Sequence, residues 1–212
     1  TTANTQNSCT LVEKHAPFEM TGFDVFANQG PQKLIMMKSS AAVLHRDIDQ
    51  AIIDQLDTAT VSIAAATASL EHVVKAKVKL GNAEIPLWEE DNMFAAITPA
   101  FEAYLMQVAE FAKADYVDVK PFVGPAKKMR RWFGVNWMVH PNLTGVGTSS
   151  EKCYMWHKNA LGHAANSAEM MADGGYERKQ QINWTNASLY HGAVMLQTTG
   201  VVQMLHDGSA YA

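Results

Sequence analysis

The sequence predicts a mixed α+β fold in which helices dominate the first half of the chain and strands the second. Two stretches before residue 81 repeat apolar residues every three or four positions, which indicates helices with one buried face. After residue 130 the chain carries short runs rich in Val, Trp, Tyr and Phe, which are typical of strands. Between these halves, residues 93–107 combine an apolar run, a Thr-Pro break and a helical pattern in one compact unit.

Composition narrows the class of protein. The 212 residues suffice for one large domain or two small ones. Hydrophobic residues make up 48% of the chain and charged residues 18%, which indicates a hydrophobic core and a sparsely charged surface. Such a surface is often buried against other subunits, and twelve methionines suit adaptable interfaces. A net charge of −4 argues against a dedicated nucleic-acid-binding protein, and no apolar stretch is long enough for a membrane span.

The first elements lead into a long helix. Residues 1–33 lack a helical period and offer short extended pieces around Pro17 and Gly22, which end in a Gly-Pro loop. Residues 34–56 then predict a helix of about 35 Å at about 1.5 Å per residue. Its predicted packing face consists of apolar residues three or four positions apart: Leu34, Met37, Ala41, Leu44, Ile48, Ile52 and Leu56.

The middle of the chain predicts a second helix and the strand–proline–helix unit. Residues 58–68 are small and fit either a buried strand or a loop. Residues 69–80 predict a helix that starts at Ser69 as N-cap, ends at Gly81-Asn82 and buries Leu70, Val73, Val74 and residues 76–78. In residues 93–107 the strand ends at Thr98, and Pro99 lies in the first turn of the following helix.

The second half predicts strands. Residues 130–147 contain one Trp/Phe/Val-rich strand that ends at His140-Pro141 before a glycine-rich loop. Residues 151–157 predict another strand. Residues 181–208 predict two strands joined across Thr198, Thr199 and Gly200.

One segment suggests a chemical site. Cys153, His157 and His163 lie within eleven residues, and these residue types serve as metal ligands or as a nucleophile with its base. On a strand, however, Cys153 and His157 lie about 13 Å apart, too far to bind one ion. His163 follows a glycine in an expected turn. We therefore interpret these residues as structural and expect no catalytic residue, no metal and no cofactor. The alternative, from a different functional class, is that the chain is a small α+β enzyme with a Cys/His site.

A basic cluster, Lys127, Lys128, Arg130 and Arg131, precedes Trp132 and Phe133. Cations beside aromatic residues are typical of nucleic-acid contacts, but the cluster also fits a solvated turn. Pairing with the acidic residues 89–91 of a neighbouring subunit is a further alternative. The sequence contains no phosphate-binding loop and no GxGxxG, GxSxG or HExxH motif, and the two cysteines, Cys9 and Cys153, form no CxxC pair and fit a reducing cytoplasm.

The order of elements resembles the major capsid proteins of tailed bacteriophages, whose Johnson fold is shared with herpesvirus shells and encapsulins. The resemblance rests on five segments taken in order: DIDQAIIDQLDTA (47–59), FAAITPAFEAYLMQ (94–107), EFAKADYVDV (110–119), RRWFGVNWMVHPNLTGVGTSSEKCYMWHKNALGHAAN (130–166) and NWTNASLYHGAVMLQTTGVVQML (183–205). It covers about residues 9–208.

The resemblance implies a peripheral domain, built on a spine helix and a β-ribbon, and an axial domain with a central mixed sheet flanked by helices. Residues 1–58 would hold the end of the extended-loop region, a peripheral strand and the spine helix over 34–57. Residues 59–176 would form the axial domain, and residues 177–212 the strands that return to the peripheral domain.

The resemblance also implies a function. The chain would be the structural subunit of an icosahedral phage head, forming hexamers and pentamers around non-specifically held double-stranded DNA. Its partners would be neighbouring copies and scaffold, portal or decoration proteins, with assembly in the bacterial host cytoplasm and a final place in the virion. An encapsulin-like compartment for protein cargo is the alternative.

The family's N-terminal arm and extended loop have no counterpart in residues 1–33, and the chain begins at a threonine. We therefore expect several tens of residues upstream in the encoded protein. Residues 1–212 alone are expected to fold as a monomer or small oligomer and not to close a shell, because arm and loop carry the contacts between subunits.

Overall fold

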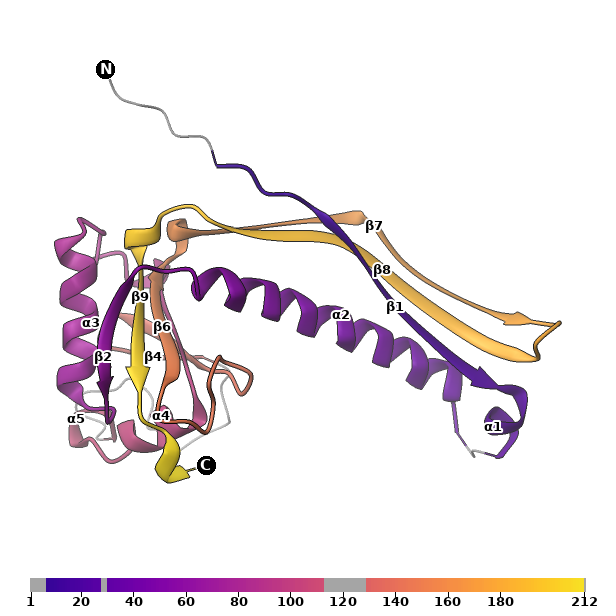
Figure 1. Ribbon diagram of the computed structural model, residues 1–212, viewed down its shortest axis with the longest axis horizontal. Coiled ribbons are helices and arrows are strands. Elements are labelled where there is room, and N and C mark those ends of the chain that lie inside the picture. The colour runs from indigo at the N-terminus through magenta and orange to yellow at the C-terminus, as the bar shows by residue number, and fades with distance from the viewer. Residues whose placement is uncertain (1–6, 28–29, 113–128, 212) are drawn as a thin grey trace, which may run out of the picture. The chain divides into compact units, whose positions relative to one another are not determined.

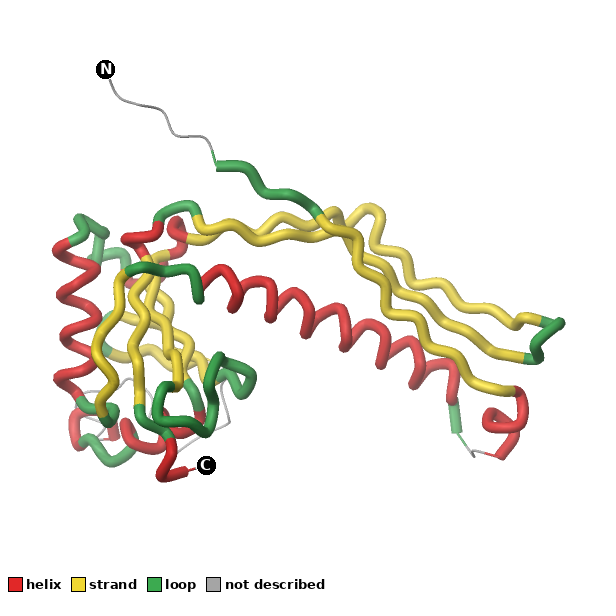
Figure 2. Tube along the Cα trace, viewed as in Figure 1, coloured by secondary structure: helices red, strands yellow, loops and turns green. Residues whose placement is uncertain are grey.

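The computed structural model describes residues 7–27, 30–112 and 129–211, and it divides the chain into two compact units (Figure 1). Unit 1 comprises Thr1–Ile52 and His163–Val194, and unit 2 comprises Ile53–Gly162 and Met195–Ala212. Both units combine helices with a sheet (Figure 2), which confirms the predicted α+β class.

Unit 1 is a three-stranded sheet with a long helix. The strand order is β1-β8-β7, and β1 runs antiparallel to β8 from the pair Val12 and His191 to the pair Thr21 and Ile182. The elements of unit 1 are β1 (Val12–Thr21), α1 (Gly22–Ala27), α2 (Gln32–Leu56, which ends in unit 2), β7 (Leu161–Glu177) and β8 (Ile182–Met195). The predicted long helix is confirmed, whereas the short helix α1 was not foreseen.

Among the described residues of unit 1, a small hydrophobic cluster joins α2 to the sheet. Leu44 of α2 packs with Ala16 of β1 and with Ala187 and Leu189 of β8, and Ile48 lies against this cluster half-buried. The other buried side chains of this unit include polar ones: Ser40, Asn183, Thr185 and His191. Because apolar burial supplies most of the free energy of folding, this cluster is expected to contribute strongly to the stability of unit 1.

The predicted packing face of α2 is wrong at the N-terminal end of the helix. Leu34 is 49% exposed and Met37 39% exposed, while Met36 and Ser40 are buried there. Toward the C-terminal end the predicted face agrees better with burial: Leu44 and Leu56 are buried, and Ala41, Ile48 and Ile52 are half-buried. The buried row runs through residues 36, 40 and 44, and hydrophobicity could not reveal it because a serine occupies its second position.

Unit 2 is built around a six-stranded mixed sheet. The strand order is β2-β9-β6-β3-β5-β4; β2 with β9 and β3 with β5 are parallel, and the other pairs are antiparallel. The strands are β2 (Val61–Ala66), β3 (Met93–Ile97), β4 (Met129–Trp132), β5 (Val135–Val139), β6 (Glu151–His157) and β9 (Val201–His206). The helices are α3 (Leu70–Asn82), α4 (Pro99–Leu105) and α5 (Ala109–Ala112), and short 3-10 turns follow at η1 (Glu90–Asn92), η2 (Lys158–Ala160), η3 (Thr198–Gly200) and η4 (Ser209–Tyr211).

Unit 2 has a large hydrophobic core among its described residues. Side chains of the sheet, α3 and α4 meet in one cluster of buried residues that includes Val73, Leu80, Met93, Ile97, Phe101, Trp137, Met155, Val202 and Met204. Figure 1 shows α3 alongside the β2 edge of this sheet. Unit 2 therefore has the apolar burial expected of a stable domain.

The predicted starts of the helices α3 and α4 are confirmed. Ser69 caps α3, because its hydroxyl accepts a hydrogen bond from the backbone N–H of His72 at 3.3 Å. Thr98 caps α4 in the same way through the N–H of Phe101 at 3.2 Å, and Pro99 opens the helix. On α3, Val78 is 53% exposed, which corrects its predicted burial.

Residues 130–147 form a hairpin rather than one strand. Strands β4 and β5 pair antiparallel across a tight turn at Phe133 and Gly134, whose φ angles are +54° and +68°. Positive φ at both central residues is the geometry of a type I′ hairpin turn. The turn was missed because Phe-Gly lacks the Asn or Asp that usually marks it.

The structure divides the chain at other points than the predicted boundaries 1–58, 59–176 and 177–212. β7 belongs to the sheet of unit 1, and β9 belongs to the sheet of unit 2. β9 lies in the sheet of unit 2 because it pairs with both β2 and β6 and buries Val201, Val202 and Met204. Only β8 of the closing pair therefore joins β1.

Gly192 permits a close approach that predicts a local defect. A Cβ atom at Gly192 would lie 2.4 Å from the backbone oxygen of Thr10 and 2.9 Å from Cys9 Sγ. Gly192→Ala is therefore expected to displace residues 9–11 from β8, because a backbone atom cannot move aside cheaply. Hydrogen exchange should rise at residues 9–13 and stay unchanged in unit 2. Ser188→Ala, also on β8, serves as the control, and equal protection in both variants would contradict the expectation.

Candidate functional site

The structure does not bring Cys153, His157 and His163 together as a site. Cys153 and His157 lie on β6 in unit 2, as the strand prediction for residues 151–157 placed them, whereas His163 lies on β7 in unit 1 and not in a turn. Cys153 is fully buried in the unit 2 core, and burial raises the pKa of its thiol to about 12. His157 is also buried, and its Nε2 lies 3.3 Å from Glu89 Oε2. Within the described ranges, no group of three or more His, Cys, Asp or Glu residues could hold a metal ion.

The burial of Cys153 predicts unequal thiol reactivity. A thiol must ionise to react, so the raised pKa and the burial of Cys153 should protect it, while half-buried Cys9 reacts. A thiol reagent added to the native protein should therefore label about one cysteine per chain, and both after denaturation. Cys9→Ser should abolish the native labelling and Cys153→Ser should preserve it; the reverse pattern would show that β6 is accessible.

Only the two arginines of the basic cluster lie among the described residues. Lys127 and Lys128 lie outside the described residues. Arg130 lies 3.2 Å from Glu102, and Arg131 forms ion pairs with Glu90 and Asp91. The acidic stretch considered as a partner on a neighbouring subunit is thus paired with Arg131 of the same chain.

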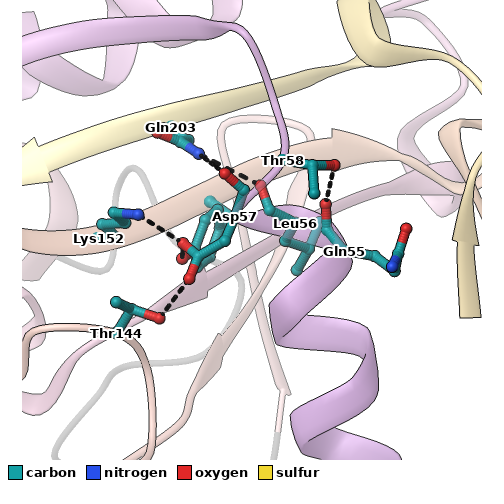
Figure 3. Close-up of polar contacts among 8 residues, drawn as sticks. Gln55, Leu56, Asp57, Thr58, Thr144, Lys152 and Gln203 are labelled. Carbon is teal, nitrogen blue, oxygen red and sulfur yellow. Dashed lines mark hydrogen bonds and ion pairs between the residues drawn. The ribbon is translucent and has the colours of Figure 1, made fainter.

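A polar junction at the C-terminal end of α2 was not foreseen (Figure 3). Asp57 directly follows the last residue of α2, and its carboxylate accepts hydrogen bonds from Thr144 at 2.7 Å, from Lys152 at 2.9 Å and from the Tyr154 hydroxyl. The Nε2 atom of Gln203 donates to the backbone oxygen of Asp57 at 2.9 Å and to that of Leu56 at 3.4 Å. We call Asp57, Thr144, Lys152, Tyr154 and Gln203 the α2 anchor.

The α2 anchor satisfies groups that a helix end leaves open. The last carbonyl groups of a helix lack partners within it, and Gln203 of β9 supplies one from the sheet. Burial alone would raise the pKa of Asp57, but the hydrogen bonds from Tyr154, Thr144 and Lys152 outweigh it and lower the pKa below its usual range. The anchor therefore fixes the end of α2 to β6 and β9 as an ionised, fully bonded cluster.

A fully buried carboxylate, that of Glu151, joins three other segments of unit 2. Glu151, at the start of β6, is fully buried and accepts hydrogen bonds from the Thr98 hydroxyl at 2.5 Å and from the N–H of Gly147 at 2.7 Å. A Cβ atom at Gly208 would lie 2.1 Å from Glu151 Oε1, so the chain after β9 also packs directly on this group. Glu151 thus joins the cap of α4, the loop before β6 and the C-terminal segment.

Unit 1 contains a related cluster around Asp47 of α2. Asp47 lies 2.8 Å from His191 Nε2 on β8 and 3.3 Å from Lys14 Nζ on β1. Burial would raise the pKa of Asp47, but the hydrogen bonds from His191 and Lys14 lower it. His163, the third residue of the Cys/His segment, lies beside this cluster: the centre of its ring is 5.7 Å from that of His191. The carboxylates of Asp47, Asp57 and Glu151 therefore each connect elements that are far apart in sequence, which is a structural role.

Both units expose large apolar side chains. Phe23 is 76% exposed in unit 1 and Trp88 79% exposed in unit 2. Others with at least two-fifths of their surface exposed include Leu11, Val12, Leu34, Ile35, Val43, Val78, Val146, Tyr176 and Leu196. Exposed aromatic residues are common where proteins contact one another. No helix in the described part of the chain is long and apolar enough to cross a membrane.

Comparison with known proteins agrees with this framework. The family model for phage capsid proteins matches residues 1–208. No curated protein matches the sequence.

Solved structures share the fold at low sequence identity. A structure from Mycobacterium phage Che8 has a TM-score of 0.68 and 16% identity, covering 93% of this chain and 71% of that chain. The capsid structure of cyanophage P-SCSP1u has a TM-score of 0.66 and 14% identity, with 97% and 77% covered. An encapsulin complex from Synechococcus elongatus has a TM-score of 0.61 and 13% identity, with 93% and 74% covered. The predicted Johnson-type fold is thereby confirmed.

Proposed function

The chain belongs to the phage capsid protein family, and from this membership we propose that its copies form the hexamers and pentamers of an icosahedral phage head. The observation that carries the proposal is the family match over residues 1–208, which makes the chain a structural subunit of the head shell. Identical subunits in a closed shell meet through many copies of the same interfaces, so each interface can be modest.

Within this shell, unit 1 would be the peripheral domain and unit 2 the axial domain. The long helix α2 and the three-stranded sheet of unit 1 support the first assignment, and the six-stranded mixed sheet with its helices supports the second.

The shell would enclose double-stranded DNA without reading its sequence. The net charge of −4 and the pairing of Arg130 and Arg131 with carboxylates of their own unit favour weak, non-specific contacts. Scaffold, portal or decoration proteins would be further partners. Assembly would take place in the bacterial host cytoplasm, where the free thiols of Cys9 and Cys153 stay reduced.

An encapsulin-like compartment is the second candidate, supported by the likeness to the solved encapsulin complex. The contents of purified particles distinguish the two functions. Particles from the phage-producing host should contain double-stranded DNA that resists nuclease until the shell is opened. Particles that hold a stoichiometric protein cargo and no DNA would contradict the phage-head proposal.

A further inference from the structure

The loop between α3 and β3 presents the most exposed large apolar side chain among the described residues. Trp88 is 79% exposed, whereas Trp132 and Trp137 are 4% and 3% exposed, and Trp156 and Trp184 are half-buried. Leaving a tryptophan in water forgoes a large gain in apolar burial. In binding interfaces, tryptophan is the residue type most enriched among those that carry the affinity.

Several hydrogen bonds fix the residues that directly follow Trp88 in this loop. Asn136 of β5 donates hydrogen bonds to the backbone oxygens of Glu90 and Met93, and Asn92 donates to Glu89. Glu89 also meets His157, as described above. A loop fixed in this way loses little conformational freedom when it binds, which favours affinity.

The β4–β5 turn lies beside this loop and presents a second aromatic residue. Arg131 pairs with Glu90 and Asp91, and a Cβ atom at Gly134 would lie 3.4 Å from Glu90 Cγ. Phe133 is 41% exposed at φ +54°, a conformation that L residues other than Asn and Asp rarely adopt.

Lys77 of α3 stabilises this unusual turn. Its Nζ lies 4.1 Å from the centre of the Phe133 ring and donates a hydrogen bond to the Phe133 backbone oxygen at 2.7 Å. A bulky residue kept at positive φ and half in water is a reason to look for a function at that position. Here the function that fits is a contact with another protein.

We propose that Trp88 and Phe133, with their rim of Lys77, Glu90, Asp91 and Arg131, form a contact surface for a second copy of this chain within the shell. We call these six residues the Trp88 patch. The inference deepens the proposed function and rests on it. Exposed aromatic residues in two neighbouring segments that also carry charged side chains fit the composition of interfaces, in which aromatic residues are enriched and the rim is polar.

Charge favours a second copy over a strongly charged partner. In the Trp88 patch the carboxylates of Glu90 and Asp91 are balanced by Arg131 and Lys77, so the rim is close to neutral. A near-neutral surface lets two copies of a chain with net charge −4 approach without strong repulsion. It offers no cationic surface for DNA, and a capsid supplies identical copies as the neighbours at hand.

The first test measures whether Trp88 is covered on assembly. Acrylamide quenching of tryptophan fluorescence is compared between wild type and Trp88→Phe, each as dissociated subunits and as assembled particles of the full-length gene product. The difference between the two proteins reports Trp88. We expect this difference to be large for dissociated subunits and to fall at least about threefold in particles; an equally quenched Trp88 in both states would overturn the proposal.

The second test measures assembly itself. Trp88→Ser should raise the subunit concentration needed for assembly at least about tenfold, since an anchoring tryptophan commonly accounts for that much per contact. Val146→Ser, which changes another exposed apolar residue of unit 2, is the control and should assemble like wild type. Melting temperatures of the dissociated subunits should agree, because Trp88 makes no part of the core.

The outcomes separate the two proposals. If wild type forms no particles under any condition, the proposed function fails. If wild type assembles and Trp88→Ser assembles equally well, the proposed function stands and the Trp88 patch does not.

Discussion

Asp57→Ala is expected to lower the free energy of unfolding of unit 2 by about 2–4 kcal/mol. Removing one partner from a buried ion pair costs about 3–5 kcal/mol, and the Asp57 side chain is 24% exposed, which reduces that figure. The change leaves the fully buried Tyr154 and the Lys152 ammonium without the carboxylate that they share. Chemical denaturation followed by circular dichroism measures the loss.

The control is Glu110→Ala, which removes an exposed carboxylate elsewhere in unit 2. Its effect should stay within about 0.5 kcal/mol, as for most surface substitutions. If the two variants are equally stable, the α2 anchor contributes nothing to the fold.

The pH dependence gives an independent check on Asp57. Its pKa is lowered in the folded protein, so its contribution is fully present above the unfolded pKa of about 3.9 and is lost as the pH falls through the lower folded value. Wild type should therefore lose more stability than Asp57→Asn between about pH 5 and pH 2. Parallel curves for the two proteins would contradict an ionised Asp57.

Leu44→Asp is expected to unfold unit 1 locally, at a cost of about 4 kcal/mol or more. Leu44 is 2% exposed and packs against Ala16, Ala187 and Leu189 in a buried cluster of unit 1. An unpaired carboxylate there removes the central contact between α2 and the sheet. Hydrogen exchange should rise sharply in β1, β8 and the first turns of α2, while the sheet of unit 2 keeps its protection.

Val43→Asp is the matched control for helix phase. Val43 precedes Leu44 directly but is 42% exposed, so the same charge should be tolerated there. Equal exchange in both variants would mean that α2 presents another face to the sheet.

The sequence predicted most of the elements because local signals coincide with them. The helix over residues 34–56 has a continuous apolar period. The predicted cap at Ser69 and the predicted position of Pro99 in the first turn of a helix are short-range features that the structure confirms. The resemblance to capsid proteins came from the order of such elements, and it led to the right family.

The wrong predictions concern features that are determined by contacts between distant parts of the chain. The buried row of α2 includes Ser40, whose position follows from the sheet and not from hydrophobicity. The placement of β9 depends on pairing with β2 and β6, which no local pattern reveals.

The polar clusters were missed for the same reason. Asp57 finds Thr144, Lys152 and Gln203 at separations of 87, 95 and 146 residues along the chain. Arg131 pairs with carboxylates about forty residues earlier, at Glu90 and Asp91. In contrast, Cys153, His157 and His163 are close in sequence and therefore suggest a site. The structure nevertheless places Cys153 and His157 in unit 2 and His163 in unit 1.

Electron cryomicroscopy of the purified full-length gene product tests the central claim most directly. The account predicts closed particles of uniform size, in which each subunit shows the β1-β8-β7 sheet with α2 and the six-stranded sheet in the order β2-β9-β6-β3-β5-β4, grouped in hexamers and pentamers. A protein that stays monomeric at every concentration and in every buffer in which it folds would contradict the claim that this chain builds a shell.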